Sequence, residues 1–188
     1  SVLPNLYKFV LQQSQEFATE ALNEHQRTLR MRGRPKIVLA RTYEEAMQLY
    51  NTYSNNILGI ISDARFPHDG KIDPMAGIKL LNEVRKRDPF VPLILQSSEE
   101  ENRQYVSQCE AVFIDKNSKK MNIDLREAIS ENFGFGDFVF INPNTHEEVA
   151  RVHNLKELQN IIFSIPADSF HYHISHNHVS RWLYSRAI

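Results

Sequence analysis

The amino-acid sequence predicts an α/β fold built on a doubly wound parallel sheet, followed by a small α+β segment. Two observations predict the sheet. Four short runs are apolar throughout instead of alternating with polar residues, which is typical of strands buried on both faces; they lie at residues 36–40, 57–62, 92–96 and 111–114. Segments with apolar residues at helical spacing separate these runs, and strands that alternate with helices form parallel sheets.

The elements of the first half follow from local signals. Residues 4–30 show helical spacing, and the Gly-Arg-Pro sequence at 33–35 ends this helix. After the first strand, Thr42 and Glu45 form a capping box that starts the next helix. We interpret residues 68–75, which follow the second strand, as a solvated insertion. The remaining helices of this half are expected over residues 77–87, 99–109 and about 125–133.

A break in composition at residues 134–137 divides the chain. We therefore predict one domain over residues 1–133 and a connecting segment over 134–188. Apolar runs on either side of an Asn-Pro-Asn loop predict a β-hairpin in this second segment, and helical spacing follows it. The predicted hairpin strands are 138–141 and 148–152, and the predicted helices are 154–166 and 169–183.

The composition limits the classes of function. Lys and Arg number 22 and Asp and Glu 23, so the net charge of −1 carries no signature of nucleic-acid binding. No apolar run approaches the roughly 20 residues that span a bilayer. The single cysteine, Cys109, excludes an intramolecular disulfide and fits a reducing cytoplasm. We expect a cytoplasmic protein that binds neither nucleic acid nor membrane.

Polar reactive groups stand at three predicted strand ends, which carry Asp63, Ser97 and Lys116. In parallel sheets the ligand site lies outside the carboxyl ends of the strands. A carboxylate can accept a phosphoryl group as an acyl phosphate, while a hydroxyl and an ammonium can bind phosphoryl oxygens. The pattern predicts a phosphorylation site. The structural alternatives are a turn residue at Asp63, a helix cap at Ser97 and a surface lysine at Lys116.

The sequence around these strand ends resembles the receiver domain of two-component response regulators, of the chemotaxis-regulator kind. The matching stretches are Ile60-Ile61-Ser62-Asp63-Ala64-Arg65-Phe66-Pro67, Pro92-Leu93-Ile94-Leu95-Gln96-Ser97-Ser98 and Ala111-Val112-Phe113-Ile114-Asp115-Lys116-Asn117. The resemblance covers roughly residues 1–133 and implies a flavodoxin-like fold. It implies that Asp63 is the phospho-acceptor and Ser97 the switch hydroxyl. It further implies that Lys116 contacts the phosphoryl group and that Phe113 is the switch aromatic.

The same resemblance implies a cofactor and partners. Mg²⁺ would be bound by Asp63 and the backbone carbonyl of Arg65, and a histidine kinase or phosphotransfer protein would supply the phosphoryl group. The chain would be a regulatory domain and not an enzyme. The family's first strand and its Mg²⁺-binding acidic pair would precede Ser1 and are absent from this sequence. The incomplete sheet would expose a strand edge, so a homodimer is a further expectation.

The second segment also carries a resemblance. Residues 165–170 and 172–183 resemble the connector that follows the receiver in large bacterial fusion proteins with a phosphoenolpyruvate synthase-like region. This implies an attached output domain, possessing that phosphotransferase activity, beyond the connector. The segment contains His171, His173, His176 and His178. They lack partner carboxylates at ligand spacing, so we expect a polar helix face or an interface and not a zinc site.

Two other functions compete with a phosphorylated receiver. A pseudo-receiver would keep the fold and bind proteins without being phosphorylated. A phosphatase of the haloacid-dehalogenase kind would also use an aspartate nucleophile, but it requires a second aspartate two residues later. Arg65 stands at that position, which disfavours the phosphatase.

Overall fold

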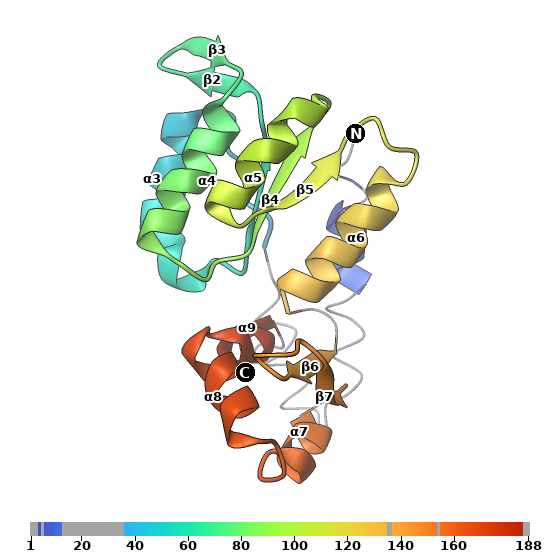
Figure 1. The fold of residues 1–188 in the computed structure, drawn as a ribbon. Helices are drawn as coiled ribbons and strands as arrows, with labels where there is room; N and C mark the ends of the chain where they lie inside the picture. The colour runs from blue at the N-terminus through green and yellow to red at the C-terminus, as the bar shows by residue number, and fades with distance from the viewer. Residues whose placement is uncertain (1–3, 5, 13–35, 135–136, 154, 186–188) are drawn as a thin grey trace. The chain divides into compact units, whose positions relative to one another are not determined.

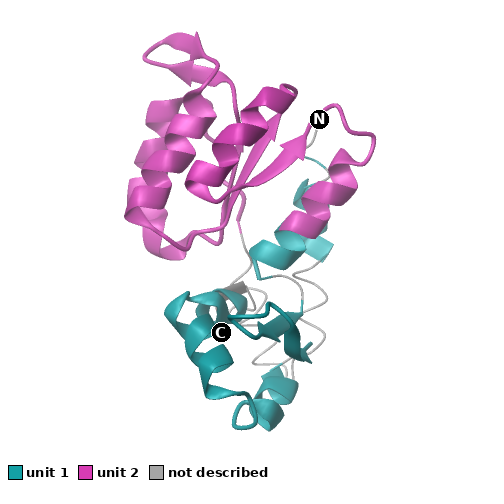
Figure 2. Cartoon of the chain, viewed as in Figure 1, with its two compact units in different colours: residues 1–35, 129–188 teal, residues 36–128 magenta. Residues whose placement is uncertain are grey.

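The computed structural model describes residues 4, 6–12, 36–134, 137–153 and 155–185. Two compact units are present (Figure 2): the sheet unit, residues 36–128, and the hairpin unit, residues 1–35 with 129–188. Most of the helix predicted over 4–30 lies outside the described residues, although 6–12 are helical. The domain boundary predicted between residues 133 and 134 stays a prediction.

The sheet unit has a mixed α/β fold with a three-stranded parallel sheet in the order β1-β4-β5 (Figure 1). Its strands confirm three of the four predicted ones. In the register, Asp63 pairs with Gln96, and Ser97 pairs with Asp115. All five residues of the central strand are buried, which explains its continuous apolar run. The strands are β1 (Ile60–Asp63), β4 (Leu93–Ser97) and β5 (Val112–Asp115).

Along the chain, α3 precedes the sheet, α4 and α5 lie between its strands, and α6 follows it. Helix α4 contacts both α3 and α5. Helix α6 begins in the sheet unit and continues past its end at residue 128. The buried residues Leu81 and Val84 of α4 join the strands in one core. No helix among the described residues is long and apolar enough to cross a lipid bilayer. The helices are α3 (Tyr43–Tyr53), α4 (Ala76–Arg87), α5 (Arg103–Cys109) and α6 (Met121–Asn132), with 3-10 turns η1 (Ser54–Asn56) and η2 (Glu100–Asn102).

The predicted start of a helix at Thr42 is confirmed. The Thr42 hydroxyl accepts a hydrogen bond from Glu45 N at 3.2 Å, which caps α3. Glu45 Oε2 accepts the N–H of Arg41 at 2.7 Å, one residue before the N-cap, whereas in a capping box it would accept the N–H of Thr42 itself. The thiol of Cys109 is 1% exposed, and burial raises its pKa. It belongs to the core of the sheet unit.

The strand predicted at residues 36–40 is wrong, because this segment forms neither helix nor strand. Val38 is 58% exposed and Leu39 52% exposed. A strand is stable only when a neighbour pairs its backbone groups. Among the described residues, the paired strands are β1-β4-β5, β2-β3 and β6-β7, and none of them pairs with residues 36–40. An apolar run alone therefore does not make this segment a strand.

Residues 68–75, interpreted as a solvated insertion, are mostly exposed, but they form regular structure that was not predicted. Strands β2 (Phe66–His68) and β3 (Lys71–Asp73) form an antiparallel hairpin. Its two turn residues both have positive φ, 51° at Asp69 and 73° at Gly70, as a type I′ turn requires. The side chain of Asp73 accepts the N–H of Met75 at 2.8 Å, which connects the hairpin to the start of α4.

The hairpin unit confirms the predicted β-hairpin. Strands β6 and β7 pair in antiparallel fashion and pack against the helices that follow. Fully or nearly buried members of this core are Phe140, Val152 and Trp182. The single helix predicted over 169–183 is wrong, because Asn177, with φ 57°, separates two helices. The elements are β6 (Phe138–Ile141), β7 (Glu148–Val152), α7 (Leu155–Ile161), α8 (Ala167–Ser175) and α9 (His178–Ser185).

Candidate functional site

Asp63 and Lys116 meet at the carboxyl end of the parallel sheet. Asp63 is the last residue of β1 and Lys116 directly follows β5, so the central strand β4 lies between them. The lysine spans that strand end, and its Nζ lies 2.7 Å from Asp63 Oδ1. The side chains are 50% and 31% exposed, so a solute can reach the pair. The expected meeting of these two residues is therefore found, while their chemical roles stay predictions.

Ser97 ends the intervening strand and is only 4% exposed. Its hydroxyl accepts hydrogen bonds from Glu99 N at 3.0 Å and from Asn102 Nδ2 at 2.8 Å. Its side chain thus holds the loop after β4, and its carbonyl accepts the N–H of Lys116 at 2.9 Å. Because Ser97 Oγ is the acceptor in both side-chain bonds, its own proton remains available for a further acceptor.

The backbone that carries Asp63 is held from two sides. Ala64 N donates to Gln96 O at 3.0 Å, and Gly77 N donates to Ala64 O at 2.9 Å. Gly77, in the first turn of α4, lies so close that a Cβ on it would be 1.9 Å from Asp63 O. Only glycine allows the helix to start against this strand end. Sequence reasoning did not predict this close contact between Gly77 and the strand end.

Phe113, the predicted switch aromatic, is a partly buried member of the sheet-unit core. The guanidinium carbon of Arg103 lies 4.4 Å from the centre of its ring, which is the geometry of a cation–π contact. The contact joins α5 to β5. A switch role for Phe113 stays a prediction.

The residues predicted to bind Mg²⁺ do not form a site for it by themselves. Lys116 is already paired with Asp63 Oδ1 at 2.7 Å. Arg65, whose carbonyl was the second expected ligand, follows in an exposed loop. One carboxylate and one carbonyl leave most of the octahedral positions that Mg²⁺ requires to other ligands. The candidate group of three metal-ligating side chains among the described residues lies elsewhere, at Glu44, His68 and Asp69.

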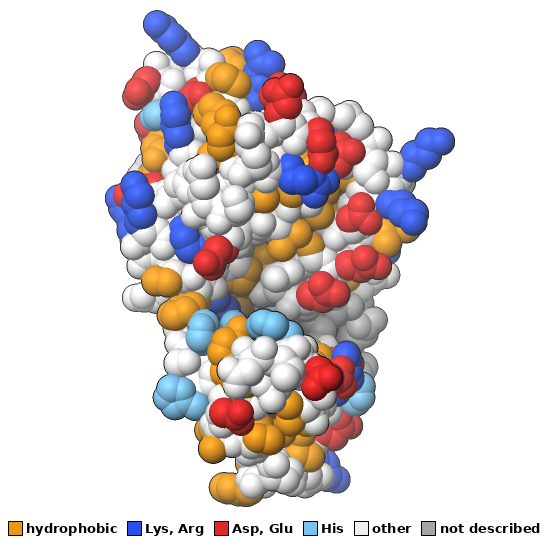
Figure 3. Space-filling view, in the orientation of Figure 1, with side chains coloured by type: hydrophobic (Ala, Val, Ile, Leu, Met, Phe, Trp, Pro, Cys, Tyr) orange, Lys and Arg blue, Asp and Glu red, His pale blue; other side chains and the backbone are white. Residues whose placement is uncertain are grey.

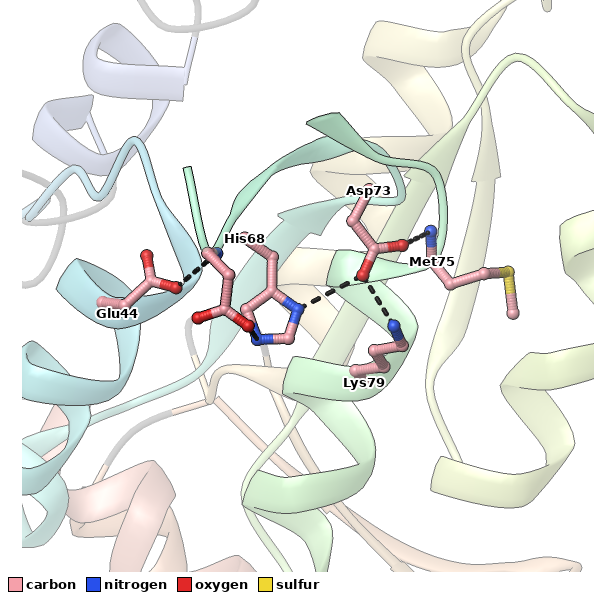
Figure 4. A network of polar contacts seen from close by, with 6 residues as sticks. Glu44, His68, Asp73, Met75 and Lys79 are labelled. Carbon is pink, nitrogen blue, oxygen red and sulfur yellow. Dashed lines mark hydrogen bonds and ion pairs between the residues drawn. The ribbon is translucent and has the colours of Figure 1, made fainter. Parts of the chain in front are cut away.

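This second cluster joins α3 to the β2–β3 hairpin (Figure 4). Glu44 Oε1 accepts the N–H of Asp69 at 2.8 Å, which holds the pKa of Glu44 below its usual value. Asp73 accepts from Lys79 Nζ at 2.7 Å. That bond, with the Met75 N–H, lowers the pKa of Asp73 to about 2. Sequence reasoning missed Glu44 and His68, because no local sequence pattern predicts that a residue of α3 lies beside a hairpin residue 24 positions later.

The four histidines, expected to form a polar helix face or an interface, differ in burial: His171 is exposed, while His173 is buried. Figure 3 shows histidine side chains gathered on this unit. His173 is buried, and its ring and that of His178 are 5.1 Å apart between centres. His173 Nε2 accepts the N–H of Ile141 at 3.0 Å. Burial lowers the pKa of both rings, that of His178 to about 4. His173 is thus a buried histidine and His178 a partly buried one, and burial favours the neutral form of both rings.

No protein-family model matches this chain, and no curated protein or solved structure was found to match it. Its function is inferred from the geometry of its own residues.

Proposed function

We propose that the chain is a receiver-like signalling module of the cytoplasm that accepts a phosphoryl group on Asp63 and regulates an attached output region. The observation that carries the proposal is the 2.7 Å contact between Lys116 Nζ and Asp63 Oδ1 at the carboxyl end of a parallel sheet. The order β1-β4-β5 also supports it. In the flavodoxin-like order 2-1-3-4-5, the last three strands are neighbours in this way.

The proposed step is a phosphoryl transfer to a carboxylate. An oxygen of Asp63 attacks the phosphorus of the donor, and an O–P bond forms while the bond from phosphorus to the leaving group breaks. The electron pair of that bond goes to the leaving group, and Asp63 becomes an acyl phosphate. Because the attacking oxygen belongs to an anion, no base is required to remove a proton.

The neighbours of Asp63 have distinct parts in this proposal. Lys116 moves from the carboxylate to a phosphoryl oxygen and neutralises its charge. Ser97 donates the hydroxyl proton that its present hydrogen bonds leave available. To do so it turns from its own loop, so the loop after β4 changes conformation with phosphorylation. The donor would be a histidine kinase or phosphotransfer protein, and the output region a phosphoenolpyruvate synthase-like phosphotransferase.

Phosphorylation can be tested with acetyl phosphate. The chain, and a version extended upstream of Ser1, are incubated with acetyl phosphate and MgCl₂, and the modified residue is located by mass spectrometry. We expect one phosphoryl group on Asp63, lost in Asp63→Asn and retained in Asp168→Asn, a matched change in the hairpin unit. Modification of another residue, or of neither protein, contradicts the proposal.

The second candidate is a pseudo-receiver that signals through protein contacts without phosphorylation. The observation in its favour is that Lys116 already neutralises Asp63 while few other Mg²⁺ ligands accompany it. The same experiment separates the two candidates. A folded, extended chain that stays unmodified in acetyl phosphate and beryllofluoride supports the pseudo-receiver.

A further inference from the structure

A second group of polar side chains lies on the sheet unit and takes no part in the proposed phosphorylation. Glu44 comes from α3, His68 from the end of β2 and Asp69 from the hairpin turn. Each offers one metal-ligating atom, and these atoms all lie within 4.8 Å of one another. Figure 4 shows the ring of His68 lying between the Glu44 side and the Asp73 side of the network.

The ring of His68 is oriented by Asp73. Its Nδ1 lies 3.2 Å from Asp73 Oδ2, and a carboxylate can only accept. Nδ1 therefore carries the hydrogen, and in the neutral ring Nε2 keeps its lone pair. That nitrogen is on the other side, 3.8 Å from Asp69 Oδ2. A histidine whose other nitrogen donates to a carboxylate is the usual arrangement of a metal-binding histidine.

Asp73 is itself held firmly. It accepts hydrogen bonds from Lys79 Nζ at 2.7 Å and from Met75 N at 2.8 Å. The ring of His68 also lies against that of Tyr43, with 4.2 Å between their centres. The position of His68 Nε2 is thus determined by contacts from β3, α4 and α3. A ligand atom fixed in this way loses little freedom when a metal binds.

The two carboxylates can close around an ion beside Nε2. When ligand atoms lie about 2.0–2.2 Å from a tetrahedral ion, two neighbouring ligand atoms are roughly 3.3–3.6 Å apart. This is slightly less than the 3.8 Å between His68 Nε2 and Asp69 Oδ2. The Asp69 side chain is 89% exposed and can rotate by this amount. Meanwhile the backbone of the turn is held on α3, because Asp69 N donates to Glu44 Oε1 at 2.8 Å.

We propose that Glu44, His68 and Asp69 bind a divalent transition-metal ion such as Zn²⁺, with Asp73 as the residue that positions His68. One imidazole nitrogen and two carboxylate oxygens suit zinc, while Mg²⁺ prefers oxygen ligands alone. Three protein ligands leave a fourth tetrahedral position for water or a substrate group. The ion would fasten the β2–β3 hairpin to α3. The site uses none of Asp63, Ser97 and Lys116, so it stands independently of the proposed phosphorylation.

Isothermal titration of the whole chain with ZnCl₂ at neutral pH tests the proposal. We expect one strong zinc site, weakened at least tenfold in His68→Gln, Glu44→Gln and Asp69→Asn. Asp73→Asn removes the positioning carboxylate, and such changes weaken metal binding about 10–100-fold. His171→Gln, an exposed histidine of the hairpin unit, is the matched control and should bind zinc as the parent does.

A structural readout locates the ion. Hydrogen exchange at the Asp69 N–H should slow with zinc in the parent and not in Glu44→Gln. Glu44 is exposed on α3, so this variant is expected to fold even if a change at His68 is not tolerated. The proposal is overturned if the parent does not bind zinc, if the cluster variants bind it as tightly as the parent, or if only His171→Gln weakens it.

Discussion

His173 Nε2 accepts a hydrogen bond from the backbone N–H of Ile141 at 3.0 Å, which joins α8 to β6. The pairing of β6 with β7 shifts in register between Phe140 and Ile141, and the ring of His173 provides this N–H with a partner. Since Nε2 accepts, the hydrogen of the neutral ring is on Nδ1, which donates to His178 Nδ1 at 3.0 Å. The hydrogen bonds therefore require both rings to be neutral.

The stability of the hairpin unit should fall in acid. Burial lowers the pKa of His178 from 6.5 to about 4 and also lowers that of His173. The unfolded chain therefore binds more protons than the folded one between these values, so stability is complete above pH 6.5 and is lost as the pH falls toward 4. Because solvent reaches part of the His178 ring, we expect a loss of about 1–2 kcal/mol at pH 5.

Urea unfolding at pH 7.5 and pH 5, followed by the fluorescence of Trp182, measures this loss. Trp182 is the only tryptophan and lies in the same core. His178→Gln should flatten the pH dependence, while the exposed His171→Gln should leave it unchanged. A parent protein equally stable at both pH values would contradict neutral burial of the pair.

Gly77→Ala should destabilise the sheet unit by about 2–4 kcal/mol, because the new Cβ would lie 1.9 Å from Asp63 O. The matched control is Gly70→Ala, which meets no atom within 4 Å and suffers only from its positive φ of 73°. That change should cost about 1 kcal/mol. Urea unfolding by circular dichroism compares the two variants. Equal losses would mean that α4 does not depend on close contact with the strand end.

Arg85→Met should cost about 2 kcal/mol, since hydrogen bonds from charged groups contribute about 1.5–3 kcal/mol. Arg85 Nε donates to Cys109 O at 2.8 Å, and Nη1 donates to Asp88 O at 3.3 Å, so one side chain connects the ends of α4 and α5. Lys86→Met, the adjacent exposed change, should alter the free energy of unfolding by less than about 0.5 kcal/mol. Thermal unfolding of both variants provides the comparison, and similar melting temperatures would refute the bridging role.

Lys116→Met should change the free energy of unfolding little while it strongly reduces phosphorylation. The ion pair with Asp63 is partly exposed, so its removal should change the free energy of unfolding by less than about 1 kcal/mol. If Lys116 binds the phosphoryl group as proposed, phosphorylation by acetyl phosphate should fall about tenfold or more. The exposed Lys119→Met is the control. Mass spectrometry at a fixed time measures the product, and undiminished phosphorylation in Lys116→Met would exclude the lysine from the step.

Sequence reasoning succeeded where the signal is local or follows from sheet geometry. The continuous apolar runs before Asp63 and Ser97 identified their strands, because burial on both faces leaves no polar alternation. The meeting of Asp63 with Lys116 followed from the rule that parallel strands end at the same edge. Thr42 showed its role as the helix N-cap within four positions of sequence.

The errors arose where the structure depends on contacts between residues far apart in the sequence, or on the backbone angle of a single residue. Residues 36–40 have the composition of a strand, but a strand also requires a neighbour. The Asp-Gly pair at 69–70 was read as part of a loop, although this dipeptide is a strong signal for a type I′ hairpin. At Asn177 a positive φ ends one helix inside an uninterrupted helical pattern. The cluster at Glu44 depends on packing of α3 against β2, which no local pattern expresses.

The reactivity of the buried thiol of Cys109 can report when the core of the sheet unit opens. It is the only cysteine, it is 1% exposed, and its raised pKa further slows reaction as a thiolate. A thiol reagent should therefore react only in molecules whose sheet-unit core has opened, so the labelling rate measures the free energy of that opening under native conditions. Because Cys109 should not react while the core is closed, cysteines introduced on the surface could be labelled selectively.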